Sequence, residues 1–273
     1  MMSMRYPAVA GRFYAGKEKE LRQEIEDCFN HRLGPGRIPH LGQGGGKIVG
    51  AVVPHAGYMY SGPVAAHVYA ALAKQGFPQT FVIIGPNHHG LGAGVAMSTE
   101  DFSTPLGVCK VDQELASQLR GLVEDDPYAH LQEHSLEVQL PFLQYFKPDV
   151  QVLPIVMMFQ DYETARELGA RLKKANEGKD VVVIASSDFS HYVSSQEAKK
   201  KDSTVIEKIL KLDARGVETA VMTNDVSMCG YGPVMAMLEA VAGREADLLK
   251  YATSGDVSPM KEVVGYAGIV VKK

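Results

Sequence analysis

Cysteine is scarce in this chain, and its cysteines lie far apart. Only three occur among the 273 residues, at Cys28, Cys109 and Cys229. No CxxC pair is present, which excludes the common paired-cysteine metal and redox motifs. An odd, sparse set also argues against a disulfide framework and fits a reducing compartment, so we expect a cytoplasmic protein.

Long apolar runs and an excess of one charge are also lacking. The longest apolar runs have the length of a β-strand and are too short to span a bilayer. The first residues lack the apolar core of a signal peptide. The formal net charge is only -4, which gives no electrostatic footprint for nucleic acid or for an anionic membrane. We therefore expect neither a membrane nor a nucleic acid as a partner.

Two common catalytic signatures are missing as well. The chain has no GxSxG nucleophile elbow, which disfavours a serine hydrolase. A glycine run at residues 44–46 precedes Lys47, but no Ser or Thr follows, and a strand is expected there instead of a helix. This glycine run therefore indicates a flexible turn and not a phosphate-binding loop.

The pattern that is present alternates strands with helices. Short β-branched runs predict buried strands at residues 47–53, 80–84, 150–157, 181–184 and 266–271. Helical spacing of apolar residues predicts helices at 17–33, 63–74, 113–123, 135–145, 162–175, 198–210, 214–223 and 233–242. This alternation implies an α/β fold, with a largely parallel central sheet and helices on both faces. No linker or repeat divides the chain, so we expect one domain over residues 1–273.

Three of the expected strands end in turns that carry histidine. The first turn carries His55, the second carries His88 and His89, and the third carries Asp188 and His191. Parallel strands bring their carboxyl ends to one edge, where open α/β sheets bind ligands. Imidazole is the commonest side-chain metal ligand and a proton shuttle near neutral pH. A lone histidine is usually structural, but three such turns together favour a functional site.

Cys229 lies just before the helix expected at 233–242. The positive end of a helix dipole favours a thiolate, which is the form that binds a metal or attacks an electrophile. A small buried apolar side chain is the alternative interpretation, and the residues leave both open. Cys28 and Cys109 fall in an expected helix and strand, where we expect them to be core residues.

A polar cluster opens the helix expected at 135–145. Glu133 and His134 precede it, and Glu137 follows three residues after His134, so that His134 and Glu137 would share a helix face. These side chains would orient metal ligands or contact a substrate. The alternative is a solvated first turn, in which Glu is favoured by the helix dipole.

These motifs together resemble the Memo family (mediator of ErbB2-driven cell motility), which includes prokaryotic members called AmmeMemoRadiSam system protein B. In chain order the matching residues are 10–14 (AGRFY), 54–58 (PHAGY), 85–89 (GPNHH), 133–137 (EHSLE), 186–191 (SSDFSH) and 229–230 (CG). The resemblance covers nearly the whole chain. It implies a fold similar to that of the class III extradiol dioxygenases, which are non-haem iron enzymes.

The resemblance also implies roles for individual residues. It implies that His55, His88 and Cys229 occupy metal-ligand positions. Asp188 and His191 would serve as supporting or acid/base groups, and His89 would contribute beside His88. The dioxygenases have a carboxylate where Cys229 stands here. Because a thiolate is softer, the expected metal is iron or copper, with zinc as a further candidate.

Two hypotheses follow from the resemblance. One is a metal-dependent oxidoreductase acting on a small molecule, and the other is a non-catalytic module that binds a metal or a peptide. Fold alone does not decide between them, since ring-opening activity does not follow from the fold. Memo-type proteins are associated with phosphotyrosine peptides, metals and redox roles. The family name suggests an AMMECR-type protein and a radical S-adenosylmethionine protein as partners.

Overall fold

The computed structural model describes residues 4–121 and 123–273 and is built around one mixed β-sheet. Five parallel strands form its centre, in the order β6, β8, β3, β9 and β2. Their bounds are Gly107–Val111, Gln151–Met157, Thr80–Pro86, Val181–Ser186 and Ile48–Val53. Since four of these were expected as strands, the largely parallel centre of the sheet is confirmed.

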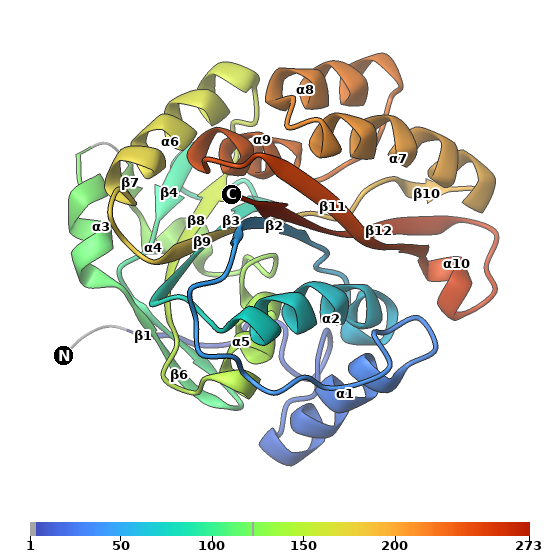
Figure 1. The fold of residues 1–273 in the computed structure, drawn as a ribbon, viewed down its shortest axis with the longest axis horizontal. Coiled ribbons are helices and arrows are strands. Elements are labelled where there is room, and N and C mark those ends of the chain that lie inside the picture. Colours follow the sequence, from blue (N-terminus) through green and yellow to red (C-terminus); the bar gives the residue numbers. More distant parts are fainter. Residues whose placement is uncertain (1–3, 122) are drawn as a thin grey trace.

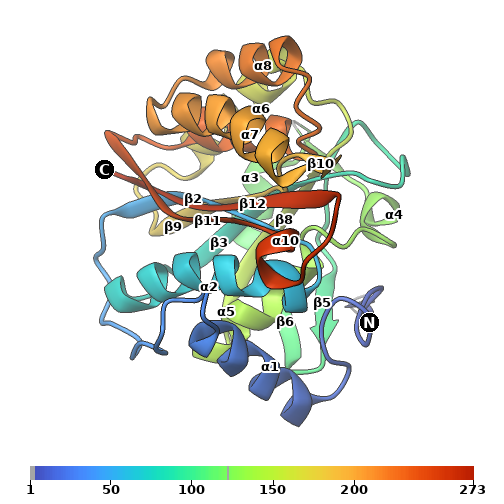
Figure 2. The same ribbon diagram turned by 90° about the vertical axis from the view of Figure 1, so that its right-hand side faces the viewer.

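Helices cover both faces of the sheet (Figure 1). On one face lie α1 (Glu18–Asn30), α2 (Tyr58–Gln75) and α5 (Leu140–Phe146). On the other lie α6 (Tyr162–Ala175), α7 (Ser195–Leu210), α8 (Ala214–Thr223) and α9 (Tyr231–Ala240). Figure 2 shows the sheet between these two layers. The expected α/β architecture is therefore confirmed.

The remaining elements are short or lie toward the sheet margins. The small helices are α3 (Gln113–Leu119), α4 (Pro127–His130), α10 (Ser254–Val257) and the 3-10 helix η1 (Glu137–Gln139). The short strands are β1 (Met4–Arg5), β4 (Val95–Met97), β5 (Asp101–Thr104), β7 (Glu124–Asp125) and β10 (His191–Val193). Within the described ranges, no helix is both long and apolar enough to cross a membrane.

The sequence patterns did not predict one long strand, β11 (Glu245–Thr253). The expected strand at 266–271 lies in β12 (Val263–Lys272), which runs antiparallel to both β2 and β11 (Glu245–Thr253). β11 itself was not expected. It carries Glu245, Asp247 and Lys250, and most of its residues are only partly buried. It therefore lacks the apolar run by which the buried strands are recognised.

The helix α1 shows why the amphipathic pattern was informative. Leu21, Ile25 and Phe29 recur every four residues and are fully buried, as helical periodicity requires. Cys28 is buried beside them, and Cys109 is buried in β6, so both are core residues as expected. The main apolar core gathers residues from Val9 to Val271.

The helix expected from Pro63 begins five residues earlier, at Tyr58. Gly57 precedes its first turn, and Pro63 lies inside it. Proline has no N–H to donate to a carbonyl four residues back, so α2 gives up one internal hydrogen bond. Because α2 starts early, only four residues separate it from β2, and His55 is held in this short connection.

Candidate metal site

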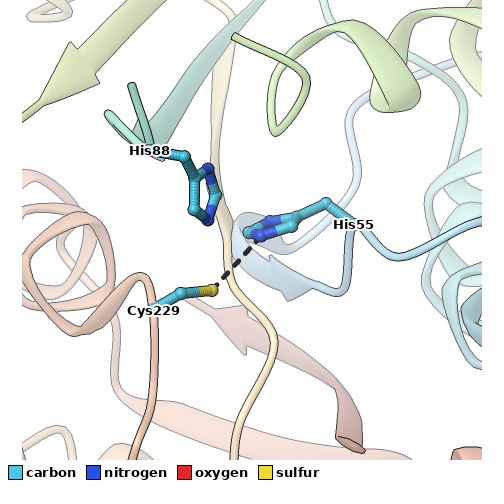
Figure 3. Close-up of side chains that lie close together, drawn as sticks. All are labelled: His55, His88 and Cys229. Carbon is cyan, nitrogen blue, oxygen red and sulfur yellow. Dashed lines mark hydrogen bonds between the residues drawn. The ribbon is translucent and has the colours of Figure 1, made fainter. Parts of the chain in front are cut away.

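The three histidine turns and the cysteine meet at the carboxyl edge of the central strands. β2, β3 and β9 are neighbouring parallel strands, and His55 and His88 follow the first two. Cys229 lies just before the amino end of α9. Figure 3 shows its sulfur beside the His55 ring. One ligand atom from each of these three residues lies within 4.8 Å of the others. Nε2 of His55 lies 3.2 Å from Sγ of Cys229.

The protonation of His55 is fixed by the groups behind it. Its Nδ1 lies 2.8 Å from Oγ of Ser186, and that hydroxyl donates its single proton to the carbonyl of Ser135 at 2.7 Å. Ser186 must therefore accept from His55, which places the proton on Nδ1 and a lone pair on Nε2. Burial, followed by the neighbouring His134 and His88, lowers the pKa of His55 well below its usual value. Its neutral ring can thus bind a metal through Nε2.

His88 is oriented by the buried carboxylate of Glu133. Nδ1 of His88 donates to Oε1 of Glu133 at 2.9 Å, and the main-chain N–H of His88 donates to Oε2 at 2.7 Å. Burial opposes the charge, but these hydrogen bonds and the neighbouring imidazoles hold the pKa of Glu133 well below its usual range. The second ring nitrogen of His88 is left free. Carboxylate support of this kind is typical of metal-binding histidines.

The structure favours the neutral one of the two interpretations that the sequence leaves open for Cys229. Burial, and then the nearby carboxylate of Asp188, raise the pKa of the Cys229 thiol well above its usual value. A helix end contributes about 0.3–1 kcal/mol at a surface, which is less than the cost of burying a charge. Without a metal, Cys229 is therefore a thiol. Its Sγ lies 3.2 Å from Nε2 of His55 and 3.5 Å from the carbonyl oxygen of Asp188.

The donor atoms fit a metal ion of ordinary coordination. Zinc bonds of about 2.0–2.1 Å to nitrogen and 2.3 Å to sulfur place those two atoms about 3.5 Å apart in a tetrahedron. The 3.2 Å between His55 and Cys229 is close to that value. A main-chain N–H of Asp188 also points at Sγ from 3.3 Å and would stabilise a bound thiolate. Three protein ligands would leave at least one coordination position open.

Asp188 and His191 lie beside this cluster and bond to different partners. Oδ1 of Asp188 accepts the main-chain N–H of His55 at 2.8 Å, and burial raises the pKa of Asp188 to about 6. His191 is partly exposed on β10, and its Nδ1 donates to the carbonyl of Ser227 at 2.7 Å. The His191 ring is therefore oriented by the carbonyl of Ser227.

His134 joins the cluster, while His89 and Glu137 do not. The His134 ring stacks on His88 at 4.6 Å between centroids, and its Nδ1 lies 3.5 Å from Oε1 of Glu133. His88, Glu133 and His134 form a second group with metal-ligand spacing. His89 is exposed. Glu137 is buried and bonds to Arg5, away from the imidazoles.

The placement of Glu137 also corrects a sequence-based expectation. His134 and Glu137 would share a face only in an α-helix. Here residues 135–136 form a turn, and a 3-10 helix begins at Glu137. The Glu137 carboxylate pairs with Arg5, whereas the His134 ring stacks on His88. The interpretation of Glu133, His134 and Glu137 as a solvated helix turn fails as well, because both glutamates are buried.

Sequence reasoning overlooked Gln139, a buried residue that supports His55. Its Nε2 donates to Oγ of Ser186 at 2.9 Å and to the carbonyl of Pro54 at 3.0 Å. It thereby fixes both the main chain and the side-chain partner of the ligand turn. Gln139 stands between the apolar residues Val138 and Leu140, which indicates that it is buried with them. Because a buried amide needs hydrogen-bond partners, this position could have suggested a supporting role.

Comparison with known proteins agrees with the expected resemblance. A family model described as Memo-like protein matches residues 5–270. MEMO1 family proteins from Methanopyrus kandleri and Pyrobaculum aerophilum are 50% and 49% identical to this chain, each covering 98% of it and 99% of their own length. A crystal structure of an uncharacterized Escherichia coli K12 protein aligns with a TM-score of 0.48 at 13% identity, covering 82% of this chain and 100% of its own. The chain belongs to the Memo-like protein family.

Proposed function

We propose that this Memo-like protein binds one metal ion through His55, His88 and Cys229 and uses it in redox chemistry on a small molecule. The observation that carries the proposal is the convergence of two free imidazole lone pairs on one sulfur atom. Each imidazole is held in the binding tautomer by a partner on Nδ1. Two nitrogens and a thiolate suit iron, copper or zinc, and the soft sulfur favours copper beside iron.

The bound metal would supply an electron-transfer or Lewis-acid centre at the open coordination position. The chain itself would position the substrate and move its protons. Because Nδ1 of His191 donates to the carbonyl of Ser227, the neutral ring would carry its lone pair on Nε2. A base of this kind would take a proton from a substrate hydroxyl bound beside it. Asp188, with a pKa of about 6, would change charge near neutral pH and tune that step.

The second candidate function is a non-catalytic module that binds a metal and a peptide. The side chain of Tyr192 favours it, because it is 74% exposed and its ring lies 6.0 Å from the ring of His191. Exposed aromatic side chains are enriched where proteins bind partners. Both candidates need the same metal ligands, and they differ in whether the bound ion turns a substrate over. AMMECR-type and radical S-adenosylmethionine proteins as partners, a cytoplasmic location and a single domain over residues 1–273 stay predictions.

The variant His191→Ala separates the two candidates. In an oxidoreductase it should keep one metal per chain and the melting temperature of the wild type, and lose oxidation of catechol-type test substrates. Metal content, melting temperature and oxygen uptake are measured on the same preparation. If neither wild type nor variant oxidises any test substrate while both hold the metal, the binding module is the better account. Loss of the metal from the variant would make His191 a ligand and contradict its assignment as a base.

A further inference from the structure

The segment 157–160 connects the turn of His88 with the turn of Cys229. It leaves the carboxyl end of β8, next to β3. On the His88 side, the carbonyl of Met157 accepts the main-chain N–H of Asn87 at 2.9 Å. The segment is anchored in the middle, since the N–H groups of Met158 and Phe159 both donate to the carbonyl of Gly94 at 2.8 and 3.1 Å.

On the other side, the nitrogen and the oxygen of the Gln160 amide both hydrogen-bond to residues 229–232, here called the cysteine turn. Its Nε2 donates to the carbonyl of Cys229 at 2.9 Å, and its Oε1 accepts the N–H of Gly232 at 2.9 Å. The two bonds bracket the turn at the start of α9. The turn packs directly on this side chain, because a Cβ on Gly232 would lie 2.7 Å from Cβ of Gln160.

The inner side of the same turn is fixed by Ser187. Its Oγ accepts the N–H of Gly230 at 3.0 Å and donates to the carbonyl of Asp188 at 2.8 Å. A Cβ on Gly230 would lie 2.5 Å from the carbonyl oxygen of Ser186, so the turn is pressed against the end of β9. The cysteine turn is therefore held between β9 on the inside and Gln160 on the outside.

We propose that Gln160 is a positioning residue for Cys229, and that segment 157–160 sets the distance between the sulfur and the ring of His88. Gln160 reaches the main chain on both sides of the turn and does not touch the donor atoms. Gln160 would affect metal binding only by fixing the position of the Cys229 sulfur. This inference rests on the proposed metal function, because it concerns the geometry of that site.

The test compares Gln160→Ala with Gln196→Ala, which removes an exposed glutamine from α7. Loss of a residue that supports a ligand typically weakens metal binding about 10–100-fold. We expect that loss for Zn²⁺ in Gln160→Ala, measured by chelator competition, with a melting temperature close to that of the wild type. The Zn²⁺ affinity of Gln160→Glu should lie between those of wild type and Gln160→Ala. Its carboxylate still accepts from the N–H of Gly232 but cannot donate to the Cys229 carbonyl.

A second readout needs no metal. In the metal-free protein, iodoacetamide should alkylate Cys229 faster in Gln160→Ala than in wild type or Gln196→Ala. Cys28 and Cys109 are buried, and peptide mass analysis assigns the modified site. Wild-type Zn²⁺ affinity together with a wild-type alkylation rate would overturn the role of Gln160. If the wild type itself binds no metal, the proposed function fails, and the alkylation rates alone decide whether Gln160 positions the cysteine.

Discussion

Glu133 and Glu137 are two buried carboxylates four residues apart, and the fold uses them in different ways. Glu133 faces the site and holds His88 by its ring and its main chain. Glu137 faces the other way and pairs with the buried guanidinium of Arg5. It also accepts hydrogen bonds from the N–H groups of Ala8 and Val9 and from the hydroxyl of Tyr14. One motif therefore supplies both a ligand support and an anchor for the N-terminal segment.

Arg5 contacts both parts of this motif, through separate N–H groups. Its guanidinium donates to the carbonyls of His130 and Glu133 as well as to the carboxylate of Glu137. Arg5 thus holds the main chain from which the Glu133 side chain reaches His88. The difference between the glutamates teaches that burial of an acidic residue does not by itself mark a metal site. The partner of each carboxylate decides its role.

The largest effect should come from breaking the anchor. Glu137→Gln leaves the Arg5 charge buried without its partner, which typically costs about 3–5 kcal/mol of unfolding free energy. Denaturant unfolding measures the loss, and the folded fraction should still bind Zn²⁺ with nearly wild-type affinity. The control Glu163→Gln breaks an exposed pair with Arg166, worth at most about 1 kcal/mol. Equal losses in the two variants would contradict the anchoring role.

A smaller effect, now on metal binding, is expected from Glu133→Gln. The amide is similar in shape but loses the charge that accepts from Nδ1 of His88, so that the ring is held less firmly. Zn²⁺ affinity should fall about 10–100-fold in chelator competition. Glu137→Gln is the matched control, since it alters a buried carboxylate on the same turn. The contrast between the two glutamates breaks down if both variants lose metal affinity equally.

The smallest effect is a dependence of metal affinity on pH. The raised pKa of Cys229 keeps its thiol protonated at neutral pH, so metal binding must displace that proton. Zn²⁺ affinity should therefore rise about tenfold per unit between about pH 7 and pH 8.5. His55 does not compete for protons there, because burial lowers its pKa. Chelator competition across this range gives the slope, and a flat profile would mean that no thiol proton is released.

Much of the fold could be predicted from local patterns. The buried strands β2, β3, β8 and β9 are continuous apolar runs, and α1 shows a clear amphipathic stripe. Parallel strand ends then place His55 and His88 at the same edge, because neighbouring strands point the same way. Local sequence was sufficient for these strands and helices, because each one carries in its own residues the apolar pattern of the face that it buries.

Contacts between distant segments could not be predicted in the same way. The pairing of Glu137 with Arg5 spans 132 residues, and the bonds from Gln160 to Cys229 span 69. The protonation state of Cys229 could not be decided from the sequence for a related reason. A helix end is visible in the sequence, but the burial that outweighs it depends on how the chain packs around the sulfur.

The most direct test of the proposed metal site is metal binding by wild type, Cys229→Ser and Cys109→Ser, each purified anaerobically. Cys109→Ser is the matched control, since it changes a buried cysteine in the core. We expect one ion per chain in wild type and Cys109→Ser, and much weaker binding in Cys229→Ser with little change in melting temperature. A hydroxyl replaces neither the charge nor the softness of a thiolate. Equal chelator-competition affinity in all three, or no metal in wild type under any condition, would contradict a His55, His88 and Cys229 metal site.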